Sequence, residues 1–268
     1  MGKRARIISF TNHKGGVGKT CTTCNVGAGL ALNEKKVLLV DLDPQANLSL
    51  SFGMKVAEKA ESDELNIYNV LVGDCRLGEI VSNVGENLDL CPSSLDLAGA
   101  ELELVSFPGR EIILRKHLQV AIENYDYVLI DCPPALGVLT YNALAAADDV
   151  FLPIQAEYLA VKGIDALKRG VGQVKEGLNP HLNISGVIIT QFDSRKILHR
   201  EVASIIERFF EVELFKTKIR NNVSLAEASL QGQDIFRYSP KSNGAEDYWS
   251  LCEEILARHP SEVCLVNC

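Results

Sequence analysis

The sequence predicts a single α/β domain built on a doubly wound, mostly parallel sheet with helices on both faces. Three observations predict it. Short apolar runs alternate with stretches of helical periodicity along the 268 residues. The runs are apolar throughout, which is typical of parallel strands buried on both faces. A glycine-rich loop or aspartates follow several of the runs, and ligands in such sheets bind at the carboxyl ends of the strands.

The expected elements follow one another along most of the chain. Strands are expected at residues 6–11, 36–41, 87–91, 126–131, 149–154, 184–190 and, as a seventh candidate, 212–219. Helices are expected at 18–33, 109–124, 159–178 and 197–210, with a last helix before residue 259. No repeat or low-complexity linker divides the chain, so we expect residues 1–258 to form one domain. Residues 259–268 are then a C-terminal tail that we expect to be disordered, and the charged run 55–65 a solvated insertion.

Composition narrows the classes of function. Apolar residues make up 47% of the chain and charged residues 23%, as in a globular protein with a sizeable core. No 18-residue apolar window and no signal-peptide pattern are present, so we expect a cytoplasmic protein with free thiols. The net charge of −8 argues against a nucleic-acid coat. A local basic patch remains compatible with it, because charges are screened beyond about 8–10 Å.

A glycine-rich loop, 12-NHKGGVGKTCTTCN-25, follows the first expected strand. The strict phosphate-loop pattern G-x-x-x-x-G-K-[ST] fails, because His13 stands at the first glycine position. Glycines still let successive backbone N–H groups converge on phosphate oxygens, and the helix that follows adds its positive end. We expect Lys19 to reach the β- and γ-phosphates and the Thr20 hydroxyl to bind Mg²⁺. The expected nucleotide contacts are Lys14, Gly15, Gly16, Val17, Gly18, Lys19, Thr20 and Cys21.

Three aspartates stand at the ends of two other expected strands. Asp131 ends a buried apolar run beside the cradle, where a carboxylate can hold Mg²⁺ through water. Asp41 and Asp43 lie on one side of the chain if their strand continues. We expect Asp43, the outer one, to orient the attacking water and Asp41 to lie near the outer shell of the metal. The alternatives are that Asp131 only caps the next turn and that Asp41 and Asp43 are merely structural.

Two cysteines lie on the helix that leaves the cradle. Cys21 and Cys24 are three residues apart and therefore share a face. That spacing could suit a metal, but no histidine or second cysteine pair at zinc-finger spacing accompanies them. We therefore expect buried helix contacts.

Five motifs taken together resemble the ParA/Soj partition ATPases, a deviant Walker A group of P-loop NTPases that includes MinD: KGGVGKT, VDLDPQAN, VLIDCPPALG, LPIQAEYLAVKG and SPKSNGAEDY. The resemblance covers residues 6–258. It implies that Lys14 is the signature lysine, which reaches the partner's phosphates in an ATP-bound homodimer. It also implies that Asp43 positions the hydrolytic water, so that Lys14, Lys19 and Asp43 are the catalytic residues.

The resemblance further implies cofactors and partners. ATP and Mg²⁺ would be the cofactors, and the dimer would bind DNA without sequence preference and so be associated with the nucleoid. A ParB-type partner protein would stimulate hydrolysis and release the dimer. Such a cycle segregates or positions a plasmid, a chromosome origin or another cargo. Membrane binding is not expected.

The DNA-binding surface is where the sequence departs from the family. Arg195 matches a DNA-contacting arginine, but the family segment I-P-R-N-V-R-L reads 219-IRNNVSL-225, so Ser224 replaces an arginine. Basic residues that could compensate are Lys196, Lys216, Lys218, Arg220, Arg237 and Lys241. Of these, Lys196, Arg220 and Arg237 join Arg195 as predicted DNA contacts. The resemblance also suggests an adenine pocket near Gln191 and Asn221–Asn222, with Asn222 as a nucleotide contact.

Four alternatives remain open. A MinD-like membrane ATPase needs a basic amphipathic C-terminal helix, whereas residues 251–268 carry three glutamates and an interrupting proline. An iron–sulfur reductase needs converging thiolates, for which Cys132 and Cys91 are the candidates. A small-molecule ligase of the dethiobiotin synthetase type could use the same cradle. A scaffold that binds ATP without hydrolysing it is the fourth, and Asp43 argues against it.

Overall fold

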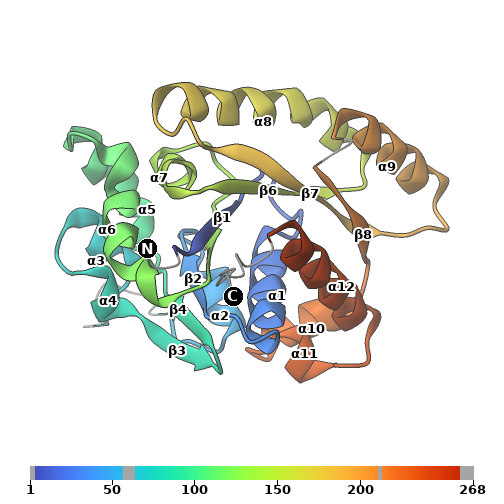
Figure 1. Ribbon diagram of the computed structural model, residues 1–268, viewed down its shortest axis with the longest axis horizontal. Coiled ribbons are helices and arrows are strands. Elements are labelled where there is room, and N and C mark those ends of the chain that lie inside the picture. The colour runs from blue at the N-terminus through green and yellow to red at the C-terminus, as the bar shows by residue number, and fades with distance from the viewer. Residues whose placement is uncertain (1–3, 57–63, 211–212, 260–268) are drawn as a thin grey trace, which may run out of the picture.

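The computed structural model describes residues 4–56, 64–210 and 213–259. Within these residues eight strands form one sheet in the order β3-β4-β2-β5-β1-β6-β7-β8 (Figure 1). All neighbouring strands are parallel except β3 and β4. The expected doubly wound, mostly parallel sheet is confirmed. The strands are β1 (Arg6–Phe10), β2 (Val37–Asp41), β3 (Ser82–Gly85), β4 (Leu88–Cys91), β5 (Tyr127–Asp131), β6 (Asp149–Gln155), β7 (Asn183–Phe192) and β8 (Leu214–Arg220).

Every apolar run expected to be a strand is one, and β3 is the strand that the pattern missed. Its sequence, SNVG, is short, and its residues are half-buried or exposed. It pairs antiparallel with β4 at the edge of the sheet. An edge strand with few buried side chains leaves no apolar run to detect.

The helices separate the strands as expected, with additional short ones. The long helices are α1 (Lys19–Leu32), α6 (Ile113–Ala121), α7 (Val138–Ala146), α8 (Tyr158–Gly177), α9 (Ile197–Phe209) and α12 (Asn243–Arg258). The shorter ones are α2 (Asn47–Ser51), α3 (Ile67–Val72), α4 (Leu77–Ile80), α5 (Leu97–Glu103), α10 (Val223–Leu230) and α11 (Ile235–Tyr238). Three 3₁₀ turns complete the set: η1 (Leu104–Ser106), η2 (Arg110–Ile112) and η3 (Ile122–Asn124), the last two flanking α6 within the single helix expected at 109–124.

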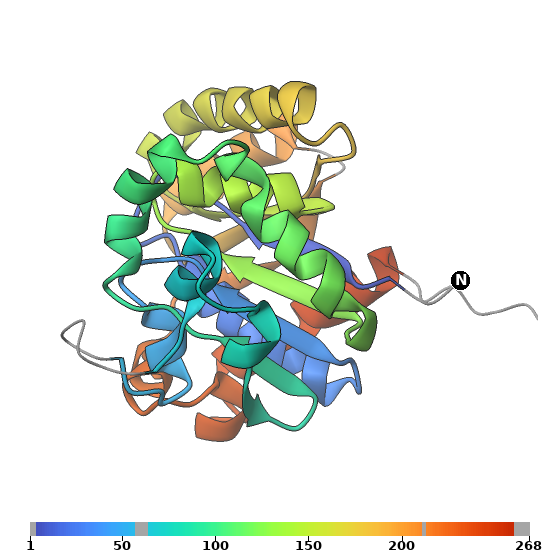
Figure 2. The same cartoon turned by 90° about the vertical axis from the view of Figure 1, so that its left-hand side faces the viewer.

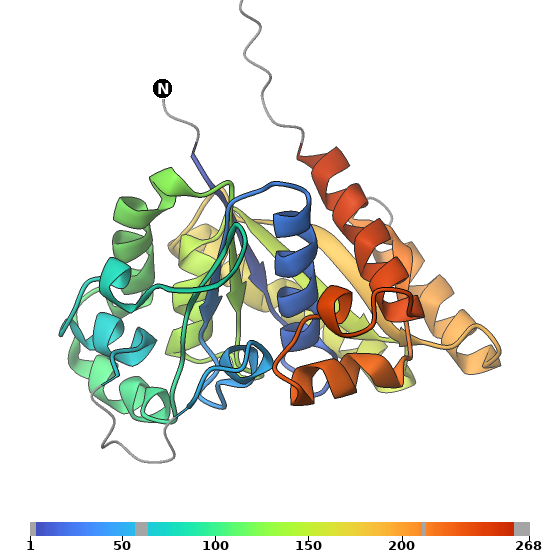
Figure 3. The same cartoon turned by 90° about the horizontal axis from the view of Figure 1, so that it is seen from below.

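Helices cover both faces of the sheet. In Figure 1, α7, α8 and α9 lie on one face, and α1 and α12 lie on the other, which Figure 3 turns toward the viewer. The side chains of each strand divide between the two resulting cores, as β1 and β2 show. Ile7 and Leu38 belong to the first core, while Ile8 and Leu39 belong to the second. Burial on both faces is why the strands read as continuous apolar runs.

Helix α12 closes the open edge of β8. The Glu254 carboxylate accepts hydrogen bonds from the backbone N–H groups of Lys216 (2.8 Å) and Thr217 (2.7 Å). Asp247 accepts from the N–H of Arg220 at 2.8 Å. These contacts satisfy strand donors that would otherwise be free to pair with another chain. Helix α12 is therefore packed on the sheet and hydrogen-bonded to β8, and it is not an exposed amphipathic helix.

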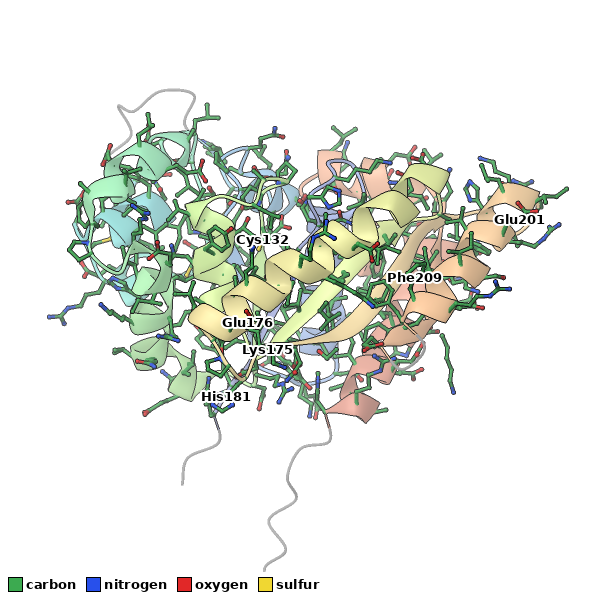
Figure 4. The ribbon with its side chains drawn as sticks, turned by 90° about the horizontal axis from the view of Figure 1, so that it is seen from above. Cys132, Lys175, Glu176, His181, Glu201 and Phe209 are labelled. Atoms are coloured by element: carbon green, nitrogen blue, oxygen red, sulfur yellow. The ribbon has the colours of Figure 1, made fainter. Side chains whose placement is uncertain are left out.

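The expected tail largely falls outside the described residues, as do residues 57–63 of the charged run. Within the described chain no helix is both long and apolar enough to cross a membrane. The two ends of the sheet are distinct in Figure 4. Cys132, which follows β5, lies at one end, and His181, which precedes β7, lies at the other. The candidate site occupies the end marked by Cys132.

Candidate nucleotide site

The glycine-rich loop joins β1 to α1 and is fastened to β7. Gly16 and Gly18 have φ values of 74° and 85°, a left-handed conformation that glycine adopts without strain. The Thr190 hydroxyl donates to the carbonyl of Val17 at 2.8 Å, and the Gln191 amide donates to the carbonyl of Gly16 at 2.7 Å. A trans peptide places its N–H opposite its C=O. The amides that follow these carbonyls therefore point away from β7, as an anion cradle requires.

The two lysines of the loop have different surroundings. Lys19 is buried at the start of α1, and its Nζ donates to the carbonyl of Lys14 at 3.3 Å. Burial lowers the pKa of Lys19, and the charges of Asp131 and Asp43 oppose that effect. Lys14 is half-exposed and points to the end of β6, where its Nζ lies 2.6 Å from the Glu157 carboxylate. Only Lys19 is thus placed to serve the cradle of its own chain.

Asp131 is fully buried at the end of β5. Within the described residues, neither of its carboxylate oxygens has a hydrogen-bond partner of normal geometry. Burial, followed by the charge of Asp41, raises its pKa well above the usual range, while the Thr20 hydroxyl and the charge of Lys19 act in the opposite direction. A buried carboxylate with two open oxygens beside a threonine hydroxyl fits the ligand set of a partly hydrated Mg²⁺ ion. The residues present therefore fit the expected metal.

Asp41 and Asp43 differ in how their carboxylates are used. Asp41 accepts from the N–H and hydroxyl of Ser49 at 2.9 and 2.8 Å, and its other oxygen accepts from the N–H of Asp43 at 3.2 Å. Burial raises the pKa of Asp41 to about 6 despite these bonds. It is the register neighbour of Asp131. Asp41 thus anchors the segment after β2, and its predicted place near the metal's outer shell stays a prediction.

Asp43 lies two residues beyond the strand and is also buried. Its Oδ1 accepts from the N–H of Gln45 at 2.9 Å, and no described residue donates to its Oδ2. Its charge acts on both Lys19 and Asp131. Asp43 therefore has one carboxylate oxygen engaged by its own loop and one oxygen available to a molecule in the site.

A cavity of about 250 Å³ opens beside the loop. It is lined by Gly18, Cys21, Thr190, Gln191, Ile219, Arg220, Asn221, Asn222, Leu225, Ala226, Ser229 and Tyr248. The residues expected near an adenine pocket thus lie together next to the cradle. Cys21 is half-buried and lines this cavity, while Cys24 is buried as expected. The part of the chain that the structure describes holds no group of three metal-ligating side chains.

The predicted DNA contacts do not form one patch. Arg195 is 88% exposed in its side chain and pairs with Asp193 through two hydrogen bonds of 3.0 and 2.9 Å. Lys196 is exposed beside it, at the start of α9. Arg237 instead pairs with Asp234 at 3.2 Å and donates to the carbonyl of Val84 at 3.1 Å, next to the opposite edge of the sheet.

Arg220 differs most from the expectation of a free surface cation. Its guanidinium lies 2.6 Å from Asp247 and 2.5 Å from Glu246, and these carboxylates raise its pKa. Two carboxylates on one guanidinium leave no net positive charge there for a phosphate. Arg195 faces one carboxylate, Asp193, and the exposed Lys196 adds a second cation beside it, so that pair keeps a net positive charge. We therefore keep Arg195 and Lys196 as the expected DNA surface.

Sequence reasoning missed two polar residues near the ends of β6 and β7, Gln155 and Thr190. Gln155 donates to the Gln191 side chain at 2.8 Å, and Thr190 fastens the loop. Both follow apolar runs, Gln155 in β6, which pairs with β1, and Thr190 in β7, which pairs with β6. The rule that singled out Asp131, a polar residue at the end of a buried strand, would have found them as well.

Known proteins are similar to this chain over most of its length. A family model described as an AAA domain matches residues 5–184. The sporulation initiation inhibitor protein Soj of Bacillus subtilis is 45% identical over 258 residues, covering 96% of this chain and 99% of that protein. The chromosome-partitioning ATPase Soj of Treponema pallidum is 42% identical over 259 residues, covering 96% of this chain and 98% of that protein.

Solved structures share the fold over nearly the whole length. A Mycobacterium smegmatis protein named cobyrinic acid a,c-diamide synthase, with bound ADP and magnesium, has a TM-score of 0.83 and 34% identity, and 96% of each chain is covered. The cell division ATPase MinD of Pyrococcus furiosus has a TM-score of 0.77 and 27% identity, covering 96% of this chain and 100% of that chain.

Proposed function

Because the chain belongs to the Soj/ParA family of chromosome-partitioning ATPases, we propose that its ATP-bound dimer binds DNA without sequence preference until a ParB-type partner stimulates hydrolysis. It is an ATPase with a P-loop NTPase fold, and ATP and Mg²⁺ are its nucleotide and its metal. The cycle operates in the cytoplasm on the nucleoid. It segregates or positions DNA or another cargo.

The placement of the two loop lysines carries the proposal. Lys19 lies inside its own cradle, so it supports the β- and γ-phosphates of the nucleotide bound by the same chain. Lys14 lies outside the cradle, beside Glu157 and Gln155, at the surface of the nucleotide end of the sheet. A second protomer that brought its own cradle to this surface would receive Lys14. A loop with one inward and one outward lysine therefore supports a dimer that shares its two sites.

Each of the other residues of the site has its own proposed role in nucleotide binding or hydrolysis. The amides of the loop and the start of α1 bind phosphate oxygens. Thr20 and Asp131 would hold Mg²⁺, which would supply positive charge against the negative charge that develops on the phosphates. Asp43 presents its open Oδ2 to the attacking water and orients it in line with the γ-phosphate. The cavity beside Cys21 and Asn222 receives the base.

Matched lysine variants test the proposed dimer. We expect Lys19→Ala to lose ATP binding, because it removes the charge in the cradle. We expect Lys14→Ala to bind ATP within about threefold of the wild type but to remain monomeric, because the lost charge serves the other subunit. Nucleotide binding by fluorescence and mass by sedimentation with ATP and Mg²⁺ measure both. Dimerisation of Lys14→Ala at the wild-type concentration would contradict the shared-site proposal.

A second assay separates partition from small-molecule chemistry, which the synthase name of one structural neighbour raises as another candidate. ATP turnover is measured with DNA alone, with the ParB-type protein of the same genome alone, and with both. We expect the two together to stimulate turnover well beyond either alone. ATP turnover that is unchanged by DNA and by the ParB-type protein, but is stimulated by a carboxylic acid plus an amine donor, would favour a synthase activity instead.

A further inference from the structure

Helix α5 and the turn η1 carry apolar side chains on two faces. The inner face, with Leu97, Ala100 and Leu104, is fully buried in the core. The outer face exposes large apolar side chains to solvent. We call these residues the outer stripe: Leu95 (52% exposed), Leu102 (80%), Val105 (62%) and Phe107 (43%).

The spacing of the outer stripe matches a docking face. Leu95 precedes α5, Leu102 lies in α5, Val105 lies in η1 and Phe107 follows η1. With the exposed Ala98 between them, Leu95, Leu102 and Val105 are spaced at intervals of three, four and three residues, the spacing of one side of a helical segment. Single exposed apolar residues are ordinary on protein surfaces, whereas a contiguous row is typical of an interaction site. Figure 2 turns this side of the molecule toward the viewer.

The rim of the outer stripe is acidic. Residues 93–112 contain four carboxylates, Asp96, Glu101, Glu103 and Glu111, against one cation, Arg110. Arg110 is itself paired with Glu111 at 3.0 Å. Glu103 also accepts a hydrogen bond from the Tyr68 hydroxyl at 3.1 Å. The pKa of Tyr68 is raised first by burial and then by Glu103, Asp74 and Asp96.

This charge identifies the kind of occupant. An acidic rim repels DNA phosphates and anionic lipid headgroups. It also repels the same stripe on a second copy of this chain. A protein segment that combines apolar anchors with flanking Lys or Arg residues is complementary to both the stripe and its rim.

The outer stripe is connected to both ends of the catalytic site. Ser93, which lies two residues before Leu95, donates its hydroxyl to the carbonyl of Asp43 at 2.8 Å. The Glu101 carboxylate packs directly on Gly137, in the loop that runs from Asp131 to α7. A segment bound to α5 would therefore act on the two loops that carry Asp43 and Asp131.

We propose that the outer stripe is the docking surface through which a basic amphipathic segment of the activating partner reaches this ATPase, and that docking there adjusts the loops of Asp43 and Asp131. The proposal rests on the proposed function, because it gives the stimulating partner a place to bind. It adds a specific surface, the chemistry of the segment that fits it, and a route from that surface to the site.

Leu102→Ser tests the apolar part of the surface, with Val120→Ser on α6 as a matched control. Val120 is 85% exposed, so both changes remove one solvent-facing apolar side chain and leave the core intact. We expect Leu102→Ser to raise the partner concentration that half-stimulates ATP turnover at least about tenfold. Basal turnover and ATP-dependent DNA binding should stay within twofold of the wild type. Val120→Ser should behave as the wild type throughout.

Charge reversal tests the rim. We expect Glu103→Lys to weaken partner stimulation as Leu102→Ser does, and a partner whose basic segment carries Lys→Glu changes to recover part of it. Equal stimulation of the wild type, Leu102→Ser and Glu103→Lys would overturn the docking surface while leaving the proposed function intact. A loss of dimerisation or of DNA binding in Leu102→Ser would assign the stripe to a second copy or to DNA and overturn the proposal. If the partner fails to stimulate the wild type, the proposed function itself fails, and the docking surface with it.

Discussion

The open oxygen of Asp43 predicts a separation of ATP binding from ATP hydrolysis. In Asp43→Asn the side chain keeps its size and keeps an acceptor for the N–H of Gln45, the one hydrogen bond that the Asp43 carboxylate receives from the described residues. The structural cost should therefore stay below about 1 kcal/mol. What the variant loses is the negative charge and the second acceptor oxygen, which would orient the attacking water.

The expected effects of Asp43→Asn on the rate of hydrolysis and on ATP affinity differ enough to be measured separately. Water activation by a positioned carboxylate is worth about 10²–10⁴ in rate, which corresponds to about 3–5.5 kcal/mol in the activation free energy. Asp43 makes no hydrogen bond to the glycine loop, so nucleotide affinity should change by less than about threefold. The variant should therefore hold ATP as tightly as the wild type does and accumulate as an ATP-bound dimer.

Single-turnover hydrolysis and equilibrium ATP binding measure the two quantities on the same preparation. Asp89→Asn is a suitable control, because Asp89 lies on β4, away from the glycine loop, and its carboxylate accepts hydrogen bonds from Tyr125 at 2.8 Å and Asn83 at 3.0 Å. A hydrolysis rate of Asp43→Asn within threefold of the wild type would refute the assignment of the water-positioning role. A parallel loss of ATP affinity would show instead that Asp43 shapes the binding site.

Three further predictions concern pH, metal and salt. The pKa of Asp41 is about 6 in the folded protein against a usual value of 3.8, so between these pH values the folded state binds a proton that the unfolded state does not. The free energy of unfolding should therefore fall as pH rises from about 4 through 6, by about 3 kcal/mol for this group. In urea unfolding, the wild type and Asp41→Asn should differ in stability by an amount that changes with pH, and a constant difference would contradict this. Asp131→Asn removes a buried carboxylate that has no hydrogen-bond partner of normal geometry among the described residues. The melting temperature of the nucleotide-free protein should therefore rise, and the Mg²⁺-dependent part of the further rise that ATP causes should disappear, as it does in EDTA. An unchanged Mg²⁺ effect would exclude Asp131 as a residue that holds the metal. Arg195→Ala should change the slope of log binding constant against log salt concentration, for ATP-dependent DNA binding, from about −3.6 to about −1.8, because two phosphate contacts per dimer are lost. An unchanged slope would show that the DNA binds a surface without Arg195.

Much of the fold and of the site could be predicted because its signals are local. The strands β1, β2 and β5 are buried on both faces and so appear as continuous apolar runs in the sequence. Parallel strands bring their carboxyl ends to one edge, so the glycine loop, Asp43 and Asp131 could be expected together before any contact was known. The short elements were missed because β3 has four residues with little burial and α5 has only seven residues, with apolar side chains on two faces.

The sequence by itself determined the class of fold, the phosphate cradle and the aspartates around it, because glycine conformation, apolar runs and residue order act over a few neighbouring positions. The tertiary structure decided how the charges are used. Lys14 meets Glu157 across 143 residues, and Arg220 meets Asp247 across 27, which makes one lysine outward-facing and neutralises one predicted DNA contact. It also decided which face of α5 stays in solvent. Contacts between segments that are distant in the chain depend on how the sheet and helices pack, and this packing cannot be read from the spacing of residues along the sequence.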